Sequence, residues 1–179
     1  MRIIRGSHKS KKIVAPNNLP VRPTTDFAKE SLFNILENYF HLDTVTVLDI
    51  FAGTGNISYE FAARGAEKIT AVDVLDVCVD FINKTAKSLD FHQLTALKMD
   101  ALSFLGRGTQ AVNIIFADPP YDWDKYNRIP ELVFEKNLLL PNGFLVIEHD
   151  ISLDFKAHPK FYQQRAYGKV NFSIFAENL

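Results

Sequence analysis

The feature that most constrains the fold is an alternation that begins at residue 45. Short runs rich in β-branched and other apolar residues alternate with longer stretches whose apolar residues recur at helical spacing. Strands that alternate with helices are typical of a parallel sheet with helices on both faces. The sequence therefore predicts an α/β chain with a doubly wound sheet, whose strands cover residues 45–50, 68–72, 94–97, 113–117 and 144–148.

The two ends of the chain depart from this alternation. Residues 161–167 and 170–175 flank Gly168, which predicts a closing antiparallel hairpin. Residues 2–5 and 12–15 are two short apolar-polar runs that predict a second, smaller β-hairpin. The expected architecture is thus one sheet domain with a small N-terminal extension.

A helix is expected to join the extension to the sheet. Prolines exclude regular structure before it, at Pro16, Pro20 and Pro23. Thr25 or Asp26 can cap the helix, and one face of it is apolar, with Ala28, Leu32, Ile35, Leu36 and Tyr39. We therefore divide the chain into an N-terminal arm, residues 1–25, and one domain, residues 26–179.

The arm carries most of the basic character. The net charge of the chain is −1, yet the arm holds six of the 20 Lys and Arg residues and none of the 21 Asp and Glu residues. Such an arm can bind a polyanion, although a solvated terminus that happens to be basic is the plain alternative. The six cations are the candidate substrate-binding residues: Arg2, Arg5, Lys9, Lys11, Lys12 and Arg22.

Several classes of protein are excluded by simple counts. No apolar run approaches the roughly 20 residues of a membrane-spanning helix, and the first residues do not resemble a signal peptide. The single cysteine, Cys78, has no internal partner and lies among apolar residues, so we expect a core position in a cytoplasmic protein. The five histidines lack metal-ligand spacing, so we expect no metal. We also expect a monomer with no membrane partner.

A glycine-rich loop follows the first predicted strand. Residues 49–55 read Asp-Ile-Phe-Ala-Gly-Thr-Gly, and ligands of open α/β sheets bind outside the carboxyl ends of the strands. The spacing is not that of a dinucleotide loop, and Asp49 precedes the glycines. A carboxylate near the loop suits a cofactor with ammonium and sulfonium charges better than it suits a pyrophosphate. The alternative is a tight strand-to-helix turn without a ligand.

Acids also follow the next two strands. Asp73 stands about 20 residues beyond the loop, where an acid accepts hydrogen bonds from ribose hydroxyls. Asp100 can accept from the adenine amino group, whereas Asp76 is expected to cap the next helix. The candidate cofactor-binding residues are Asp49, Phe51, Gly53, Gly55, Asp73, Asp100 and Ala101.

The most specific motif is Asp118-Pro119-Pro120-Tyr121, which follows the fourth strand. An exocyclic amine on a base is a poor nucleophile because its lone pair is delocalised into the ring. Asp118 and the Pro119 carbonyl are acceptors that favour a tetrahedral nitrogen, and proline has no N–H to compete. Tyr121 offers a face for a base taken out of its stack. We therefore take all four as catalytic and expect no general base of shifted pKa before attack.

These motifs, together with Arg2-Ile3-Ile4, Gly6, the stretch from Arg22 to Asp26 with Glu30, and Tyr167-Gly168, resemble those of the RsmD family. The resemblance covers nearly the whole chain. It implies a seven-stranded class I, Rossmann-like methyltransferase sheet, S-adenosylmethionine as donor, and the guanine N2 amine of 16S rRNA as target, in an assembled or partly assembled small subunit. Two positions depart from the family pattern: Ser10 replaces a glycine in the arm, and Asn56 replaces a small residue.

Other functions stay open from the residues alone. The same tetrapeptide serves adenine and cytosine in DNA, although the chain has no extra segment for reading duplex DNA. Methylation of a protein glutamine is a further alternative, for which the tetrapeptide usually begins with Asn. A cofactor-binding scaffold without catalysis is the alternative outside enzymes.

Overall fold

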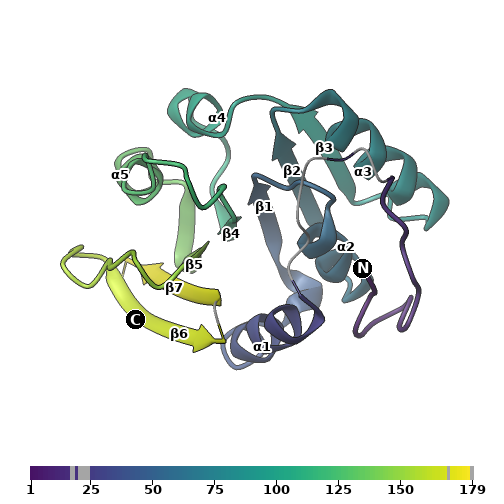
Figure 1. Cartoon of the computed structure of the whole chain (residues 1–179), viewed down its shortest axis with the longest axis horizontal. Helices are drawn as coiled ribbons and strands as arrows, with labels where there is room; N and C mark the ends of the chain where they lie inside the picture. Colours follow the sequence, from purple (N-terminus) through teal and green to yellow (C-terminus); the bar gives the residue numbers. More distant parts are fainter. Residues whose placement is uncertain (17–18, 20–24, 169, 178–179) are drawn as a thin grey trace.

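The computed structural model describes the chain except residues 17–18, 20–24, 169 and 178–179. Its centre is one sheet of seven strands in the order β3-β2-β1-β4-β5-β7-β6 (Figure 1). The first five strands run parallel, and β7 inserts antiparallel between β5 and β6. The strands are β1 (Thr46–Ile50), β2 (Lys68–Asp73), β3 (Leu94–Lys98), β4 (Val112–Ala117), β5 (Leu139–His149), β6 (Phe161–Tyr167) and β7 (Val170–Ala176).

Helices cover both faces of this sheet, which confirms the predicted doubly wound arrangement (Figure 1). Helices α1, α2 and α3 pack on one face, and α4 and α5 pack on the other. The Thr25 hydroxyl caps α1 by accepting from the Ala28 amide at 3.2 Å, as expected. The helices are α1 (Asp26–Leu36), α2 (Asn56–Ala63), α3 (Asp76–Ser88), α4 (Ala101–Arg107) and α5 (Arg128–Glu135), with a short 3₁₀ helix at Leu42–Thr44.

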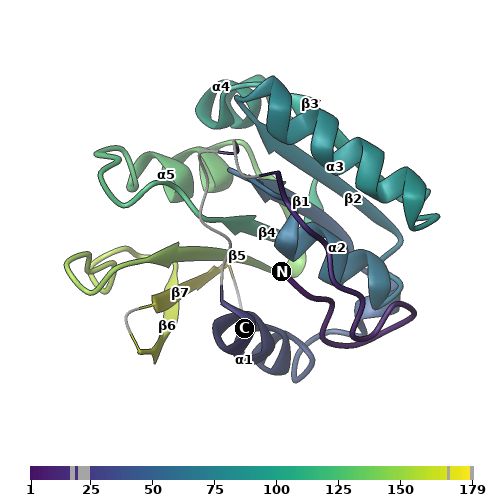
Figure 2. The same cartoon turned by 45° about the vertical axis from the view of Figure 1, so that its right-hand side comes forward.

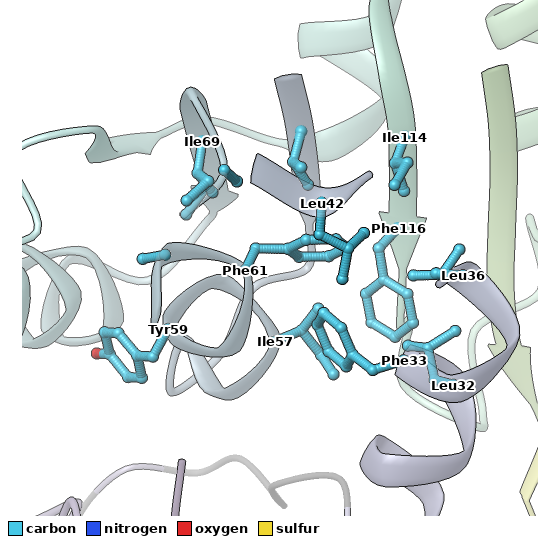
Figure 3. Close-up of a cluster of buried hydrophobic side chains, with 14 of the residues drawn as sticks. Leu32, Phe33, Leu36, Leu42, Ile57, Tyr59, Phe61, Ile69, Ile114 and Phe116 are labelled. Atoms are coloured by element: carbon cyan, nitrogen blue, oxygen red, sulfur yellow. The ribbon is translucent and has the colours of Figure 1, made fainter. Parts of the chain in front are cut away.

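Aromatic side chains join α1 and α2 to the sheet (Figure 3). Phe33 of α1 and Phe61 of α2 are fully buried and meet edge to face, with ring centroids 4.6 Å apart. Phe116 of β4 lies in the same cluster. Edge-to-face pairs add about 0.5–1.5 kcal/mol beyond their area burial, so this cluster fixes both helices against the strands. Cys78 of α3 is buried in the described structure, as expected.

Two expected boundaries differ. Helix α1 ends at Leu36, so Tyr39 lies beyond it and packs its ring on Phe144, with centroids 4.9 Å apart. Strand β5 begins at Leu139, earlier than expected, because Leu139 pairs with Val112 before a register shift. Among the described residues, no helix is long and apolar enough to cross a membrane.

Residues 4–7 of the arm lie against α2 (Figure 2). The expected hairpin is present as a turn closed by a single antiparallel bridge, between Arg2 and Lys12. Ser10 lies in this turn with φ of 68°, in the left-handed region that favours glycine. The departure from the family pattern at Ser10 therefore falls on a position where the backbone conformation itself favours glycine.

Candidate active site

The glycine-rich loop lies at the carboxyl end of β1 and bends sharply. Phe51, Gly53 and Gly55 have φ of 60°, 54° and 78°. A Cβ on Gly55 would lie 2.8 Å from atoms of both Tyr59 and Ile82. Glycine is therefore favoured at position 55 both by the backbone conformation and by the close packing of Tyr59 and Ile82.

Asp73 supports this loop directly. One carboxylate oxygen accepts from the Gly53 amide at 2.8 Å, and the other accepts from the Leu75 amide at 2.9 Å. Asp73 thus shapes the loop from the end of β2, in addition to the ribose contact predicted for it. The sequence carries no sign of this second task, because 20 residues separate Asp73 from Gly53.

Asp49 is the most buried acid beside the loop. It is 2% exposed, and one of its oxygens accepts from the Ser58 hydroxyl at 2.5 Å. Burial raises the pKa of Asp49 to about 7, and the nearby Asp73 charge adds to this rise, whereas the Ser58 hydrogen bond opposes it. A cation bound next to this carboxyl group would favour its ionised form, so Asp49 is chemically suited to bind a cation.

The acids after β3 and at the start of α3 are exposed. Asp100 caps α4 by accepting from the Ser103 amide at 2.8 Å, and the buried Ala101 begins that helix. The expected cap of α3 is wrong: Leu75 holds the cap position, and Asp76 pairs with Lys98 at 2.5 Å. The cap cannot form because Asp76 already lies inside the first turn.

Asp118 directly follows β4 and lies next to a second acid. Ala117, the last residue of β4, pairs with Ile147 of β5, so Asp118 comes to lie beside Glu148, the next residue of β5. Burial raises the pKa of Asp118 well above its usual range, and the charges of Glu148 and then Asp49 raise it further. The sequence pattern gives no reason to expect this shift. The pattern also does not predict that Glu148 lies close to Asp118, because this proximity results from the register between β4 and β5.

The proline carbonyls have a partner that the sequence does not indicate. The Tyr126 hydroxyl donates to the Pro119 carbonyl at 3.0 Å and to the Pro120 carbonyl at 3.2 Å. Tyr126 is 3% exposed, so the loop after β4 is tied to a buried phenol. A carbonyl oxygen has two lone pairs, and Pro119 retains one for a second donor.

Aromatic rings bring the two loops together. Phe51 of the glycine-rich loop meets Trp123 edge to face with centroids 4.9 Å apart, and Trp123 in turn meets Tyr126 at 5.7 Å. Tyr121 is 51% exposed. The predicted cofactor loop and the predicted catalytic loop are therefore neighbours at one edge of the sheet, with an accessible ring beside them.

The predicted substrate-binding cations divide into two groups. Arg2 pairs with Asp26 and Arg5 pairs with Glu37, each at 3.1 Å, so these two arginines are partly neutralised. Arg22 lies outside the described residues. The three exposed lysines of the arm form no ion pair with any described residue: Lys9, Lys11 and Lys12. The structure describes no group of three His, Cys, Asp or Glu side chains that could hold a metal ion.

Known proteins resemble this chain in both sequence and fold. A family model described as "Conserved hypothetical protein 95" matches residues 1–176. YlbH of Bacillus subtilis, whose name gives it as a candidate rRNA methyltransferase, is 34% identical over 154 residues, which span 84% of this chain and 83% of YlbH. The "Ribosomal RNA small subunit methyltransferase D" of Haemophilus influenzae is 30% identical over 152 residues, spanning 83% of this chain and 78% of that protein.

Solved structures extend this likeness. The Escherichia coli protein yhhF, described as a candidate methyltransferase, superposes with a TM-score of 0.86 at 25% identity and covers 99% of this chain and 98% of its own. SMU.776, a candidate methyltransferase complexed with SAH, has a TM-score of 0.64 at 17% identity over 83% of this chain and 49% of its own. Since the family model spans almost every residue, the chain belongs to the family described as Conserved hypothetical protein 95, the RsmD family that its motifs resemble.

Proposed function

We propose that this chain transfers a methyl group from S-adenosylmethionine to the N2 amine of a guanine in small-subunit 16S rRNA. The observation that carries the proposal is the position of the Asp118–Tyr121 loop. It follows the central strand β4 and touches the glycine-rich loop through Phe51 and Trp123. Methyl transfer to an amine needs a loop that binds the methyl donor and a loop that activates the amine. The loops after β1 and β4 supply these two parts at the carboxyl ends of the strands.

The residues at the end of β1 and β2 fit the donor. S-adenosylmethionine supplies an activated methyl group on a sulfonium. Asp49 offers a buried carboxyl group for a cation, and Asp73 holds the loop while standing at the position of a ribose acceptor. Asp100 and Ala101 begin α4 at the next strand end, where the adenine would lie in this proposal.

Asp118 and Pro119 activate the amine. The ionised Asp118 carboxylate and the Pro119 carbonyl each accept one amine hydrogen, which favours a tetrahedral nitrogen and frees its lone pair. Once methylated, the nitrogen loses a proton, and the raised pKa of Asp118 suits this carboxylate to accept it. Tyr126 fixes the Pro119 carbonyl in place before the substrate arrives. The Tyr121 ring is exposed and offers a stacking face for the extruded guanine.

The remaining features favour folded rRNA over duplex DNA. The basic arm can bind backbone phosphates, but it offers little area for reading a duplex. An unpaired guanine in a folded RNA lowers the cost of extrusion, which is a few kcal/mol. The relatives named as small-subunit rRNA methyltransferases support the same substrate. We place the arm, residues 1–25, and the domain, residues 26–179, in a cytoplasmic monomer that acts on an assembled or partly assembled subunit.

A labelled transfer assay tests the proposal. Purified protein and methyl-labelled cofactor are incubated separately with under-methylated small subunits, naked 16S rRNA, duplex DNA and a protein extract, and each product is digested and separated. We expect label in N2-methylguanosine from the rRNA, and none with the Asp118→Ala variant. Label in N6-methyladenine, in DNA alone or in glutamine alone would overturn the substrate while leaving methyl transfer intact. No transfer to any of the four, with cofactor still bound, would favour the scaffold alternative.

A further inference from the structure

A buried charge cluster lies away from the candidate active site. It joins Lys29 of α1 to Glu60 of α2, whose side chains are 1% and 0% exposed and whose charged atoms are 3.3 Å apart. Arg64, the residue that follows α2, donates through Nε to Glu60 at 2.9 Å and is 4% exposed. Burying charges costs several kcal/mol per ion unless each is paired and hydrogen-bonded. The other hydrogen bonds of Glu60 and Lys29 therefore show which parts of the chain this cluster holds.

Both oxygens of Glu60 bind the backbone of the arm. Glu60 Oε2 accepts from the Ile4 amide at 2.8 Å, and Oε1 accepts from the Arg5 amide at 3.0 Å. Two consecutive amides of the arm therefore converge on one carboxylate. Hydrogen bonds to a charged group are worth about 1.5–3 kcal/mol each, and these two have no competing water because the carboxylate is buried.

Lys29 binds the same segment through a backbone carbonyl. Its ammonium donates to the Arg2 carbonyl at 2.5 Å and to the Asn56 side chain at 2.8 Å. Asn56 begins α2 directly after the glycine-rich loop. The unusual residue at this position therefore completes the hydrogen bonds of a buried ammonium and links the arm to the helix that starts at the loop.

Close backbone packing adds to the attachment. The Ser7 amide donates to the Ala63 carbonyl at 2.8 Å. A Cβ on Gly6 would lie 1.9 Å from that same carbonyl oxygen, and Gly6 has φ of 86°. The turn of the arm therefore rests on the last turn of α2.

We infer that Glu60 is a positioning residue for substrate binding, which with Lys29 locks residues 2–7 of the arm against α2 so that Lys9, Lys11 and Lys12 form a fixed track for RNA phosphates. The inference rests on the proposed function, since it assigns a task to the arm in binding rRNA. A fixed track loses less conformational freedom on binding than a mobile tail. It also keeps the phosphate contacts in constant relation to the catalytic loop.

Two independent variants test the lock. Gly6→Ala displaces the turn by steric overlap and leaves every charge in place, and Gly108→Ala is the matched control, because Gly108 also has a positive φ but has open space around its Cβ. We expect Gly6→Ala to speed amide exchange at Ile4 and Arg5, to weaken 16S rRNA binding about tenfold and to raise the KM for RNA. The kcat and the SAH affinity should change less than about twofold, and Gly108→Ala should change none of these.

Glu60→Gln removes the central charge, with Glu67→Gln as its control on an exposed acid that forms no ion pair with any described residue. We expect weaker RNA binding from Glu60→Gln and little effect from Glu67→Gln. Faster amide exchange without any loss of RNA affinity would overturn the lock, as would equal effects of the two glutamine variants. An unchanged salt dependence of RNA binding after neutralising Lys11 and Lys12 together would also overturn the track, because phosphate contacts predict a slope flatter by roughly one to two units. Failure of the proposed function looks different: the unaltered protein would then place no label in N2-methylguanosine of 16S rRNA, whatever the state of the arm.

Discussion

The Tyr126 hydroxyl donates to the Pro119 carbonyl at 3.0 Å and thereby holds the loop that follows β4. It donates to the Pro120 carbonyl as well, at 3.2 Å. Both carbonyls belong to the motif that we propose activates the amine. A single buried phenol thus sets the direction in which this loop presents its acceptors.

Tyr126→Phe should separate this positioning from packing. The change removes one hydroxyl and keeps the ring, so the free energy of unfolding should fall by about 1 kcal/mol. The single-turnover methyl-transfer rate should fall about tenfold because Pro119 is less well held, while calorimetry should show unchanged SAH affinity. Tyr39→Phe is the control, since it removes the exposed hydrogen bond to Tyr162. Similar rate losses in the two variants would contradict the assignment.

Asp118→Ala should greatly lower the rate of methyl transfer and change the cofactor affinity little. Loss of one preorganised electrostatic partner costs about 10²-fold or more in rate. Rapid-quench measurement of a single turnover checks the rate, and calorimetry checks the cofactor. Asp122→Ala, on an exposed neighbouring acid, should leave both intact. A normal rate with collapsed cofactor affinity would place Asp118 against the cofactor instead of the amine.

Asp49→Asn should stabilise the free protein at alkaline pH. Burial raises the pKa of Asp49 to about 7, whereas an unfolded aspartate titrates near 3.8. The folded chain thus binds this proton more tightly, and that stabilisation is complete below about pH 4 and is lost as the pH rises through 7. Asparagine cannot ionise, so the gain should reach up to about 4 kcal/mol at pH 8 and nearly vanish at pH 4.

Urea unfolding at both pH values measures the effect of Asp49→Asn. Calorimetry should show weaker SAH binding by the same variant, because a neutral amide attracts a cation less than a carboxylate does. An equal gain in stability at pH 4 and pH 8 would show that the effect is packing and not ionisation. Unchanged SAH affinity would remove Asp49 from the cofactor site.

Ser10→Gly should stabilise the arm without changing its charge. A side chain in the left-handed region costs roughly 1–2 kcal/mol, and glycine removes this strain. The larger conformational entropy of glycine in the unfolded chain offsets part of that gain. We expect a net gain of about 0.5–1 kcal/mol in the free energy of unfolding. Ser10→Ala removes the same hydroxyl and keeps the strain, so it should give no gain. A gain from both variants would trace the effect to the hydroxyl.

The elements that the sequence predicts well are those with a local cause. Strand β4 is apolar because both of its faces are covered, and α1 begins directly after Thr25 because the Thr25 hydroxyl caps the helix. The loops at the ends of β1 and β4 are likewise visible as motifs. Their side-by-side position follows from the sheet order, in which β1 and β4 are neighbours.

Contacts between distant residues could not be predicted in this way. Lys29 and Glu60 are 31 positions apart, and each alone reads as an exposed charge on a helix. Arg2 and Arg5 read as free cations, yet acids from α1 and from just beyond it reach them. Glu148 lies beside Asp118 only because β5 pairs with β4 in one register. Such contacts depend on tertiary packing, which leaves no periodic pattern in the chain.

The burial of Cys78 has a practical consequence for studying the arm. Its thiol is the only one in the sequence, it is 0% exposed, and burial raises its pKa to about 11. A maleimide dye reacts with thiolates, so the native protein offers it almost no target at neutral pH. A cysteine placed at Lys9 or at Asp122 would then carry the dye alone, and paired dyes on the two sites would report the distance between arm and catalytic loop during each turnover.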